Sequence, residues 1–167
     1  MFIELEPVFN NIGEKLDFNY SLDLSRLQIG LGFPFEKPIV VSGSVFNRAG
    51  VVRLEAEAEV LMSAPCDLCA APTQKRSIVP VSHILVTSLN DEENDDEFVL
   101  VEEMRFDLDE LVREDIILSL PARFVCRDDC KGLCPQCGKN LNEGSCSCKA
   151  EGDPRLAALA QLLDDTE

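Results

Sequence analysis

Eight cysteines are the residues of this 167-residue sequence with the clearest capacity for chemistry. Six of them lie within residues 126–148, with the spacings C-x3-C, C-x2-C and C-x-C, and Cys66 and Cys69 form a second C-x2-C upstream. Two thiolates three positions apart can hold one metal ion while the backbone N–H groups of the turn face the sulfurs. In CPQCGK, Gly138 suits the left-handed corner of such a turn. The pattern predicts zinc binding.

Eight thiolates divide naturally into two four-thiolate sites, and short loop closure indicates the simplest division. One ion would be bound by Cys134, Cys137, Cys146 and Cys148, and the other by Cys66, Cys69, Cys126 and Cys130. The main alternative is a single ion bound by four of the six clustered cysteines, with Cys66 and Cys69 left as a reduced pair. Four thiolates leave an ion no open coordination position, so we expect one or two structural zinc ions.

An even number of closely spaced cysteines is also typical of disulfide-rich secreted domains. The N-terminal sequence MFIELEPVFN has no basic region, no apolar core and no cleavage site of a secretory signal, which favours reduced cysteines and a cytoplasmic location. The familiar ferredoxin spacings of iron–sulfur proteins are absent. No apolar run approaches the roughly 18 residues that a membrane span needs, so we expect no membrane contact.

The chain is strongly acidic, with a formal net charge of −16. Thirteen acids and two arginines lie within residues 91–115, whereas segment 126–149 is nearly neutral. Because most of this surface would repel a nucleic-acid backbone, a basic protein is the easier partner. The acidic run 90–97 is either a solvated surface loop or a segment that attracts such a basic partner. A direct RNA contact would need four cations to converge on one face: Arg127, Lys131, Lys139 and Lys149.

Strands are the main elements that would position the cysteines. Apolar and polar residues alternate over 16–24 and again over 52–62, which is the period of a half-buried strand. A helix is the rival interpretation of 53–62, but at helical spacing its acids would encircle the axis. Residues 38–87 therefore predict an antiparallel meander with Cys66 and Cys69 at a hairpin tip, and a further strand is expected at 97–104.

The clearest helix is predicted at 107–120. Asp107 can cap its amino end, with Glu110 completing a capping box, and Pro121 ends it. An apolar stripe follows at helical spacing: Leu108, Leu111, Val112 and Ile116. A short terminal helix is expected after Asp153, where Pro154 suits the first helical position.

These elements predict an α+β fold. Residues 1–125 would form an antiparallel β-sheet or open β-barrel-like domain with one main helix, and residues 126–167 a cysteine-rich zinc-binding module with the terminal helix. His83, the single histidine, has no cysteine or acid close to it in sequence and fits an ordinary strand residue. The sequence holds no phosphate-binding loop and no nucleophile beside a histidine, so we expect neither enzymatic activity nor a small-molecule substrate.

Five pieces of the sequence together resemble the YceD family. They are PCDLC, LVREDIILSLP, CKGLCPQCGKNLN, the C-x-C that follows, and DPRLAAL, and they are collinear over about residues 66–163. Members of this family are linked to accumulation of large-subunit ribosomal RNA in bacteria and plant organelles, and the bacterial gene commonly neighbours that of a large-subunit ribosomal protein. The resemblance implies a zinc-stabilised adaptor in ribosome biogenesis or rRNA processing, which would bind a large-subunit ribosomal protein or the rRNA. The alternative is a thiol-based redox or metal-sensing protein.

Overall fold

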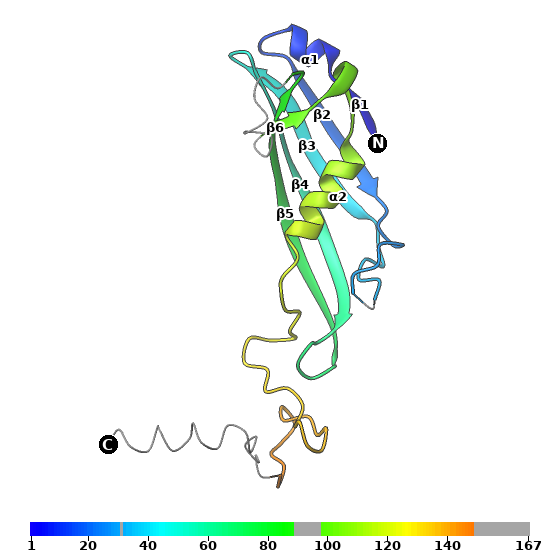
Figure 1. The fold of residues 1–167 in the computed structure, drawn as a ribbon, viewed down its shortest axis with the longest axis vertical. Coiled ribbons are helices and arrows are strands. Elements are labelled where there is room, and N and C mark those ends of the chain that lie inside the picture. The colour runs from blue at the N-terminus through cyan, green and yellow to red at the C-terminus, as the bar shows by residue number, and fades with distance from the viewer. Residues whose placement is uncertain (31, 89–97, 149–167) are drawn as a thin grey trace, which may run out of the picture.

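The computed structural model describes residues 1–30, 32–88 and 98–148, and Figure 1 shows an elongated molecule whose long sheet leads to the cysteine-rich segment at one end. The elements are β1 (Phe2–Glu4), α1 (Glu6–Asn10), β2 (Lys15–Leu22), β3 (Ile39–Arg48), β4 (Val51–Pro65), β5 (Pro72–Val86), β6 (Phe98–Leu100), the 3-10 turn η2 (Glu102–Met104), β7 (Arg105–Asp107) and α2 (Leu108–Leu118). The predicted α+β class with one main helix is confirmed. None of the helices in the described ranges is long and apolar enough to cross a membrane.

The main sheet contains five strands in the order β2-β3-β4-β5-β6. Strands β2 to β5 pair antiparallel with their sequence neighbours, so the predicted meander is confirmed. Strands β4 and β5 each have 15 residues, and they pair with each other as far as Pro65 and Pro72, whereas β3 leaves β4 at Glu59. The β4–β5 hairpin therefore projects beyond the rest of the sheet and carries Cys66 and Cys69 at its tip (Figure 1).

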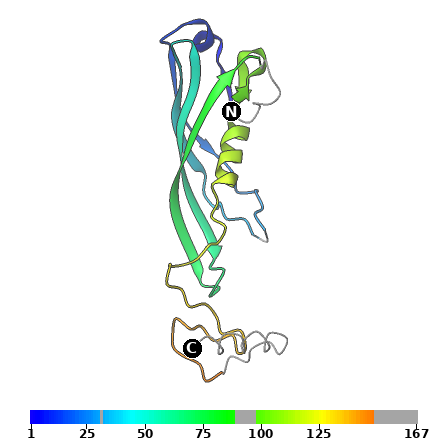
Figure 2. The ribbon, with the colours of Figure 1, turned by 60° about the vertical axis from the view of Figure 1, so that its left-hand side comes forward.

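Alternation along β4 gives the sheet two different faces. The even positions from Val52 to Met62 are buried or nearly so, and the odd positions Arg53, Glu55, Glu57 and Glu59 are exposed. The rival helix interpretation of 53–62 is therefore wrong. Helix α2 and the loop that follows β2 lie on the same side of the sheet, the side of the buried even positions (Figure 2). The opposite face is left open by the described elements.

Helix α2 anchors the chain just before the cysteine-rich segment. Leu108, Val112 and Ile116 are fully buried, so the predicted apolar stripe faces the core. Asp107 caps the helix, because its Oδ1 accepts a hydrogen bond from the Asp109 N–H at 3.1 Å. Glu110 lies 3.6 Å from Arg113, and no capping-box bond from its side chain is formed. The helix ends at Leu118, before Ser119 and Pro121.

The strand expected at 97–104 is wrong beyond Leu100. Strand β6 has only three residues and runs parallel to β5, and the chain then turns through Glu103 and Met104, whose φ angles are 52° and 56°. A left-handed backbone conformation is unusual for residues other than glycine, and no residue type in the sequence signals this turn. It allows β7 to pair with β1 in a separate two-stranded sheet.

One short helix has no signal in the sequence, and two predicted segments lie outside the described residues. Helix α1 was not predicted, because five residues are too few to show a helical period. The acidic run 90–97 and the terminal helix after Asp153 lie outside the described residues.

Replacement of Val112 by Asp is expected to destabilise the protein by roughly 3 kcal/mol or more, because a carboxylate would be buried without a partner. The free energy of unfolding of the metal-loaded protein in urea measures this effect. Leu118→Asp on the same helix is the matched control, since Leu118 is 84% exposed. It should cost about 1 kcal/mol or less. Equal losses in the two variants would contradict the placement of Val112 in the core.

Candidate metal centre

The structure brings the eight cysteines together in two groups of four. We name them site 1, which contains Cys66, Cys69, Cys126 and Cys130, and site 2, which contains Cys134, Cys137, Cys146 and Cys148. Within each site all four sulfur atoms lie within 4.8 Å of one another. This is the division that loop closure favoured in the sequence, and it does not leave Cys66 and Cys69 apart as the alternative required.

Sulfur distances in site 1 match those of a metal-thiolate tetrahedron. The Sγ atoms of Cys69 and Cys126 are 3.7 Å apart, and those of Cys66 and Cys130 are 3.9 Å apart. Zn–S bonds of about 2.3 Å place tetrahedral sulfurs about 3.8 Å apart, whereas a disulfide needs about 2.05 Å. All eight cysteines are free. The donor set fits a tetrahedral zinc ion in each site.

Each site contains one C-x2-C turn, and the two turns have the same backbone hydrogen bonds. In site 1, Cys66 N donates to Ala71 O and Ala70 N donates to Cys66 O, both at 2.8 Å. In site 2, Cys134 N donates to Lys139 O at 2.8 Å and Gly138 N donates to Cys134 O at 2.9 Å. The residue after the second cysteine is left-handed in both turns, with φ of 56° at Ala70 and 70° at Gly138. The two turns are thus structural equivalents, although only one has the expected glycine.

The surroundings of site 1 stabilise the thiolate form of Cys66 and disfavour that of Cys126. Burial alone would raise the pKa of the Cys66 thiol, but the N–H groups of Cys69, Cys126 and Leu68 face its sulfur and lower its pKa to about 6. Burial and hydrogen bonds from the neighbouring sulfurs raise the pKa of Cys126 to about 12. A divalent cation would remove this conflict, because its positive charge stabilises all four thiolates together.

Site 2 shows the same division of charge. The N–H groups of Cys137 and Gln136 lower the pKa of Cys134 to about 6. The pKa of Cys148 is raised to about 12, mainly by its hydrogen bond with Cys137 and by burial. In both sites the electrostatics therefore suit a bound cation better than four free thiols.

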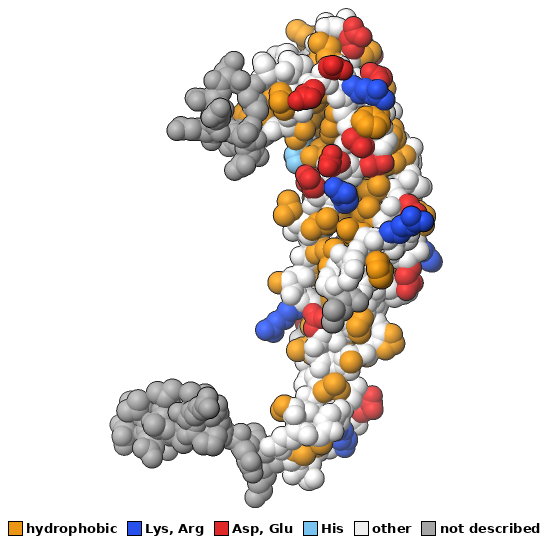
Figure 3. Space-filling model, turned by 45° about the vertical axis from the view of Figure 1, so that its right-hand side comes forward, with side chains coloured by type: hydrophobic (Ala, Val, Ile, Leu, Met, Phe, Trp, Pro, Cys, Tyr) orange, Lys and Arg blue, Asp and Glu red, His pale blue; other side chains and the backbone are white. Residues whose placement is uncertain are grey.

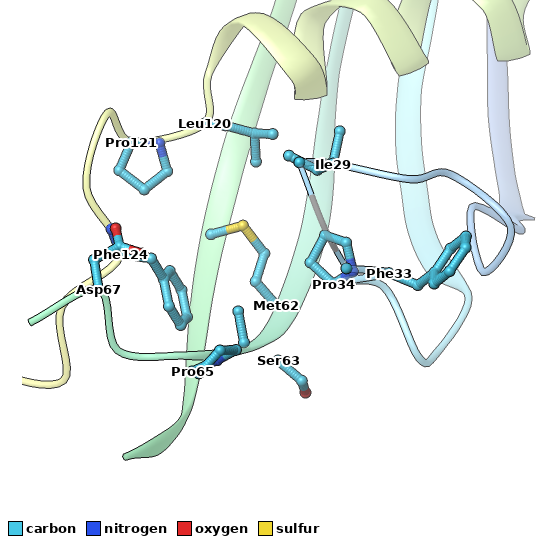
Figure 4. A pocket seen from close by; sticks show the side chains of 13 residues that line it. Ile29, Phe33, Pro34, Met62, Ser63, Pro65, Asp67, Leu120, Pro121 and Phe124 are labelled. Carbon is cyan, nitrogen blue, oxygen red and sulfur yellow. The ribbon is translucent and has the colours of Figure 1, made fainter. Parts of the chain in front are cut away.

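Contacts beside site 1 hold the segment after α2 against the hairpin tip. Asp67 N donates to Phe124 O at 2.8 Å, and Phe124 N donates to the Asp67 carboxylate at 2.6 Å. A cavity of about 640 Å³ lies next to this contact, between residues 29–30 and 32–34, the end of β4 and segment 120–124. Figure 4 shows Met62, Leu120 and Phe124 converging on it. These contacts fix the point from which the chain enters Cys126.

Two of the four cations named for an RNA contact make internal contacts in the cysteine-rich segment. Arg127 lies 3.3 Å from Asp129, and Lys139 donates to the carbonyl of Ser145 at 2.7 Å. Lys149, the fourth cation named for an RNA contact, lies outside the described residues. On the face drawn in Figure 3, charged side chains are few on the cysteine-rich end and acids gather at the opposite end. This distribution gives no support to a direct RNA contact.

His83 lies on β5, and its Nε2 is 2.7 Å from the Oδ2 of Asp115 in α2. No local sequence pattern indicates this pair, because its two residues are 32 positions apart. Both side chains are partly buried, at 26% and 17% exposure. The pair ties the main helix to the sheet.

Comparison with known families identifies one match. The YceD family, described as large ribosomal RNA subunit accumulation protein YceD, matches residues 53–163. This range includes all eight cysteines and begins in β4. No solved structure matches the chain.

Similar proteins occur in bacteria and plants. An uncharacterized protein of Mycobacterium tuberculosis is 32% identical over 101 residues, which are 59% of this chain and 49% of that protein. The uncharacterized protein YlbN of Bacillus subtilis is 26% identical over 153 residues, covering 90% of this chain and 89% of YlbN. The chloroplastic large ribosomal RNA subunit accumulation protein YCED homolog 1 of Zea mays is 26% identical over 153 residues, covering 73% of this chain and 52% of that protein. The chain thus spans about half the length of the mycobacterial and maize relatives.

Two zinc ions per chain are expected in the freshly purified, reduced protein, with all eight thiols masked until a chelator is added. Replacing Cys66 and Cys69 together by Ser should leave one zinc, and so should replacing Cys134 and Cys137 together. Elemental analysis with thiol titration before and after chelation measures both quantities. One zinc in the unaltered chain, or no metal with few free thiols, would contradict the two-site assignment, and the second result would favour thiol-based redox chemistry.

Opposite effects are expected from exchanging the left-handed residues of the two turns. Ala70→Gly should tighten zinc binding at site 1 about 5-fold, because glycine relieves roughly 1 kcal/mol of left-handed strain. Gly138→Ala should weaken site 2 by a similar factor, since the added Cβ meets no atom within 4 Å and the strain in φ is the whole effect. Chelator competition measures both affinities. A loss of affinity in Ala70→Gly would contradict the equivalence of the two turns.

Proposed function

The chain belongs to the YceD family, and from this premise we propose that it is a non-enzymatic factor in the biogenesis of the large ribosomal subunit. The match over residues 53–163 carries the proposal. Relatives in Zea mays and Arabidopsis thaliana are named large ribosomal RNA subunit accumulation protein YCED homolog 1. We propose the same role for this chain, namely support of the accumulation or processing of large-subunit rRNA.

The two cysteine sites support a zinc-stabilised adaptor. Each site offers four sulfurs, and a tetrahedral zinc ion with four thiolates has no position left for water or substrate. Tetrahedral four-sulfur sites are typical of zinc or iron–sulfur centres, and zinc needs no further inorganic sulfide. The metal would then act as a fold-stabilising element. Reduced thiols of this kind suit a reducing compartment such as the cytoplasm.

The absence of enzymatic activity is part of the proposal. The single histidine contacts Asp115, and the thiols of each site lie within 4.8 Å of one another. Neither arrangement pairs a nucleophile with a base. We therefore propose a binding function.

The open face of the sheet favours a basic protein as the partner. Glu55, Glu57 and Glu59 project from it, and we name these three residues the glutamate face. Their cross-strand neighbours on β3 and β5 are uncharged: Ser44 and Ser82, Ser42 and Pro80, and Val40 and Ile78. Among the described residues no ion pair involves any of the three glutamates. Arg53 and Arg76 lie on the same open face, at either end of the row of glutamates. The three unpaired glutamates between them would attract a lysine- and arginine-rich ribosomal protein and repel rRNA.

Purified, metal-loaded protein is expected to bind basic large-subunit ribosomal proteins and to bind rRNA fragments more weakly. Replacing all three residues of the glutamate face by Lys should reduce protein binding at least 10-fold, since charge complementarity becomes repulsion. Equilibrium binding at two salt concentrations measures this, and the affinity of the unaltered chain should fall at the higher salt. In host cells depleted of the chain, the ratio of large- to small-subunit rRNA should fall, and the triple variant should fail to restore it.

A variant with three other exposed acids changed to Lys, at Glu6, Glu14 and Glu36, is the matched control for net charge. It should retain most of the binding. Equal losses in both triple variants would show that only total charge matters. Absence of binding to either class of ligand, with an unchanged rRNA ratio in depleted cells, would reject the proposed function.

A further inference from the structure

Asn142 lies in the chain segment between cysteines of site 2, but its side chain contacts a cysteine of site 1. It lies in the segment between Cys137 and Cys146, two ligands of site 2, yet its side-chain Nδ2 is 3.4 Å from the sulfur of Cys130 in site 1. Of the side-chain contacts in the described ranges, this is the one that links the two sites through a sulfur atom. The side chain is half-buried.

All four hydrogen-bonding positions of the Asn142 amide are used. Its Oδ1 accepts from the backbone N–H of Lys131 at 2.9 Å and from the guanidinium of Arg127 at 2.8 Å. Its Nδ2 donates to Cys130 Sγ and, at 2.8 Å, to Asn140 Oδ1. An amide has two N–H donors and one oxygen with two lone pairs, so none of its capacity remains free.

These partners also determine which way the amide points. The Lys131 N–H and the guanidinium are donors only, so the amide oxygen has to face them and the NH2 group has to face the sulfur. An N–H group directed at a thiolate stabilises its negative charge and orients it for a metal. Aspartate has the same shape, but it would place a carboxylate oxygen against the sulfur in place of an N–H donor.

The position of Asn142 depends on the folding of the site 2 segment. Leu141 N donates to Gly132 O at 2.9 Å, and Asn142 N donates to Asn140 Oδ1 at 3.0 Å. Asn140 in turn pairs with Cys134's neighbour Leu133 in an isolated bridge. A metal ion that closes site 2 would hold both ends of this segment and so fix the amide against Cys130.

We propose that Asn142 couples the two cysteine sites, so that metal bound in site 2 strengthens metal binding in site 1 through the N–H···S bond to Cys130. The proposal rests on the metal occupancy stated under the proposed function. Asn142 is a positioning residue, because it acts on the metal through the sulfur. Linkage requires the effect to be reciprocal, so an ion in site 1 strengthens site 2 by the same factor.

Site-resolved zinc titration tests the coupling. The full chain is equilibrated in a series of zinc buffers, and protection from alkylation is read by mass spectrometry separately at Cys66 and Cys69 and at Cys134 and Cys137. Substitutions of residues that support metal ligands typically cost 10- to 100-fold in affinity. We expect Asn142→Asp and Asn142→Leu to weaken site 1 by about 10-fold or more, with the larger loss in Asn142→Asp.

The reciprocal measurement separates coupling from a local structural effect. Replacing Cys146 and Cys148 together by Ser should weaken zinc binding at site 1 in the chain with Asn142. The same pair of replacements should change site 1 less than 3-fold when Asn142 is already Leu. Equal losses in the two backgrounds would overturn the proposal, because the two changes would then act independently.

Ala122→Asp is the matched control for charge, since it adds a carboxylate at an exposed position of the segment that leads to site 1. It should leave site 1 unchanged, and a loss equal to that of Asn142→Asp would overturn the proposal. Two bound zinc ions with a site 1 affinity that no Asn142 variant alters would overturn the coupling alone. A chain that binds no zinc would overturn the metal sites and the coupling with them.

Discussion

The charge on four converging thiolates is the constraint on which this structure depends. Sulfur atoms within 4.8 Å of one another cannot all ionise without a cation, and each site shows the conflict as one thiol with a pKa near 6 beside another near 12. Beyond α2, the described chain has no strand or helix and only one isolated bridge, between Leu133 and Asn140. Since so little regular structure supports this segment, metal binding would supply much of its folding free energy.

The sheet contributes by setting where the first cysteines lie. Cross-strand register fixes the length of the β4–β5 hairpin, and the extension past β3 carries Cys66 and Cys69 away from the core. Helix α2 fixes the other approach, because its buried stripe sets the point at which the chain leaves for Phe124 and Cys126. Site 1 therefore connects two segments that are anchored separately, the β4–β5 hairpin and the chain that follows α2.

Periodic patterns in the sequence predicted most of the long helices and strands. They could not predict contacts between residues that are distant in the sequence. Alternation predicted β2 and β4, and helical spacing predicted α2, because one face of each of these elements packs against the core. The parallel pairing of β6 and the β1–β7 pair follow from the turn at Glu103 and Met104, which no residue type signals. The division of the cysteines followed from loop closure, since C-x2-C turns are local. Asn142 could not be predicted, because its role depends on four partners brought together by the folding of the cysteine-rich segment.

The structure explains how cysteines with the unusual spacings C-x3-C and C-x-C are positioned. Each site joins one C-x2-C turn, which its own backbone hydrogen bonds define, to one half-site that has no such turn. The second half-site has to be positioned by other contacts. In site 1 these are the Asp67–Phe124 pair and Asn142, and in site 2 the bond from Lys139 to Ser145. Sites built in this way are saturated with sulfur and tied to their surroundings. Such sites are suited to holding separate segments of the chain in place, because four thiolates leave a bound metal ion no open coordination position.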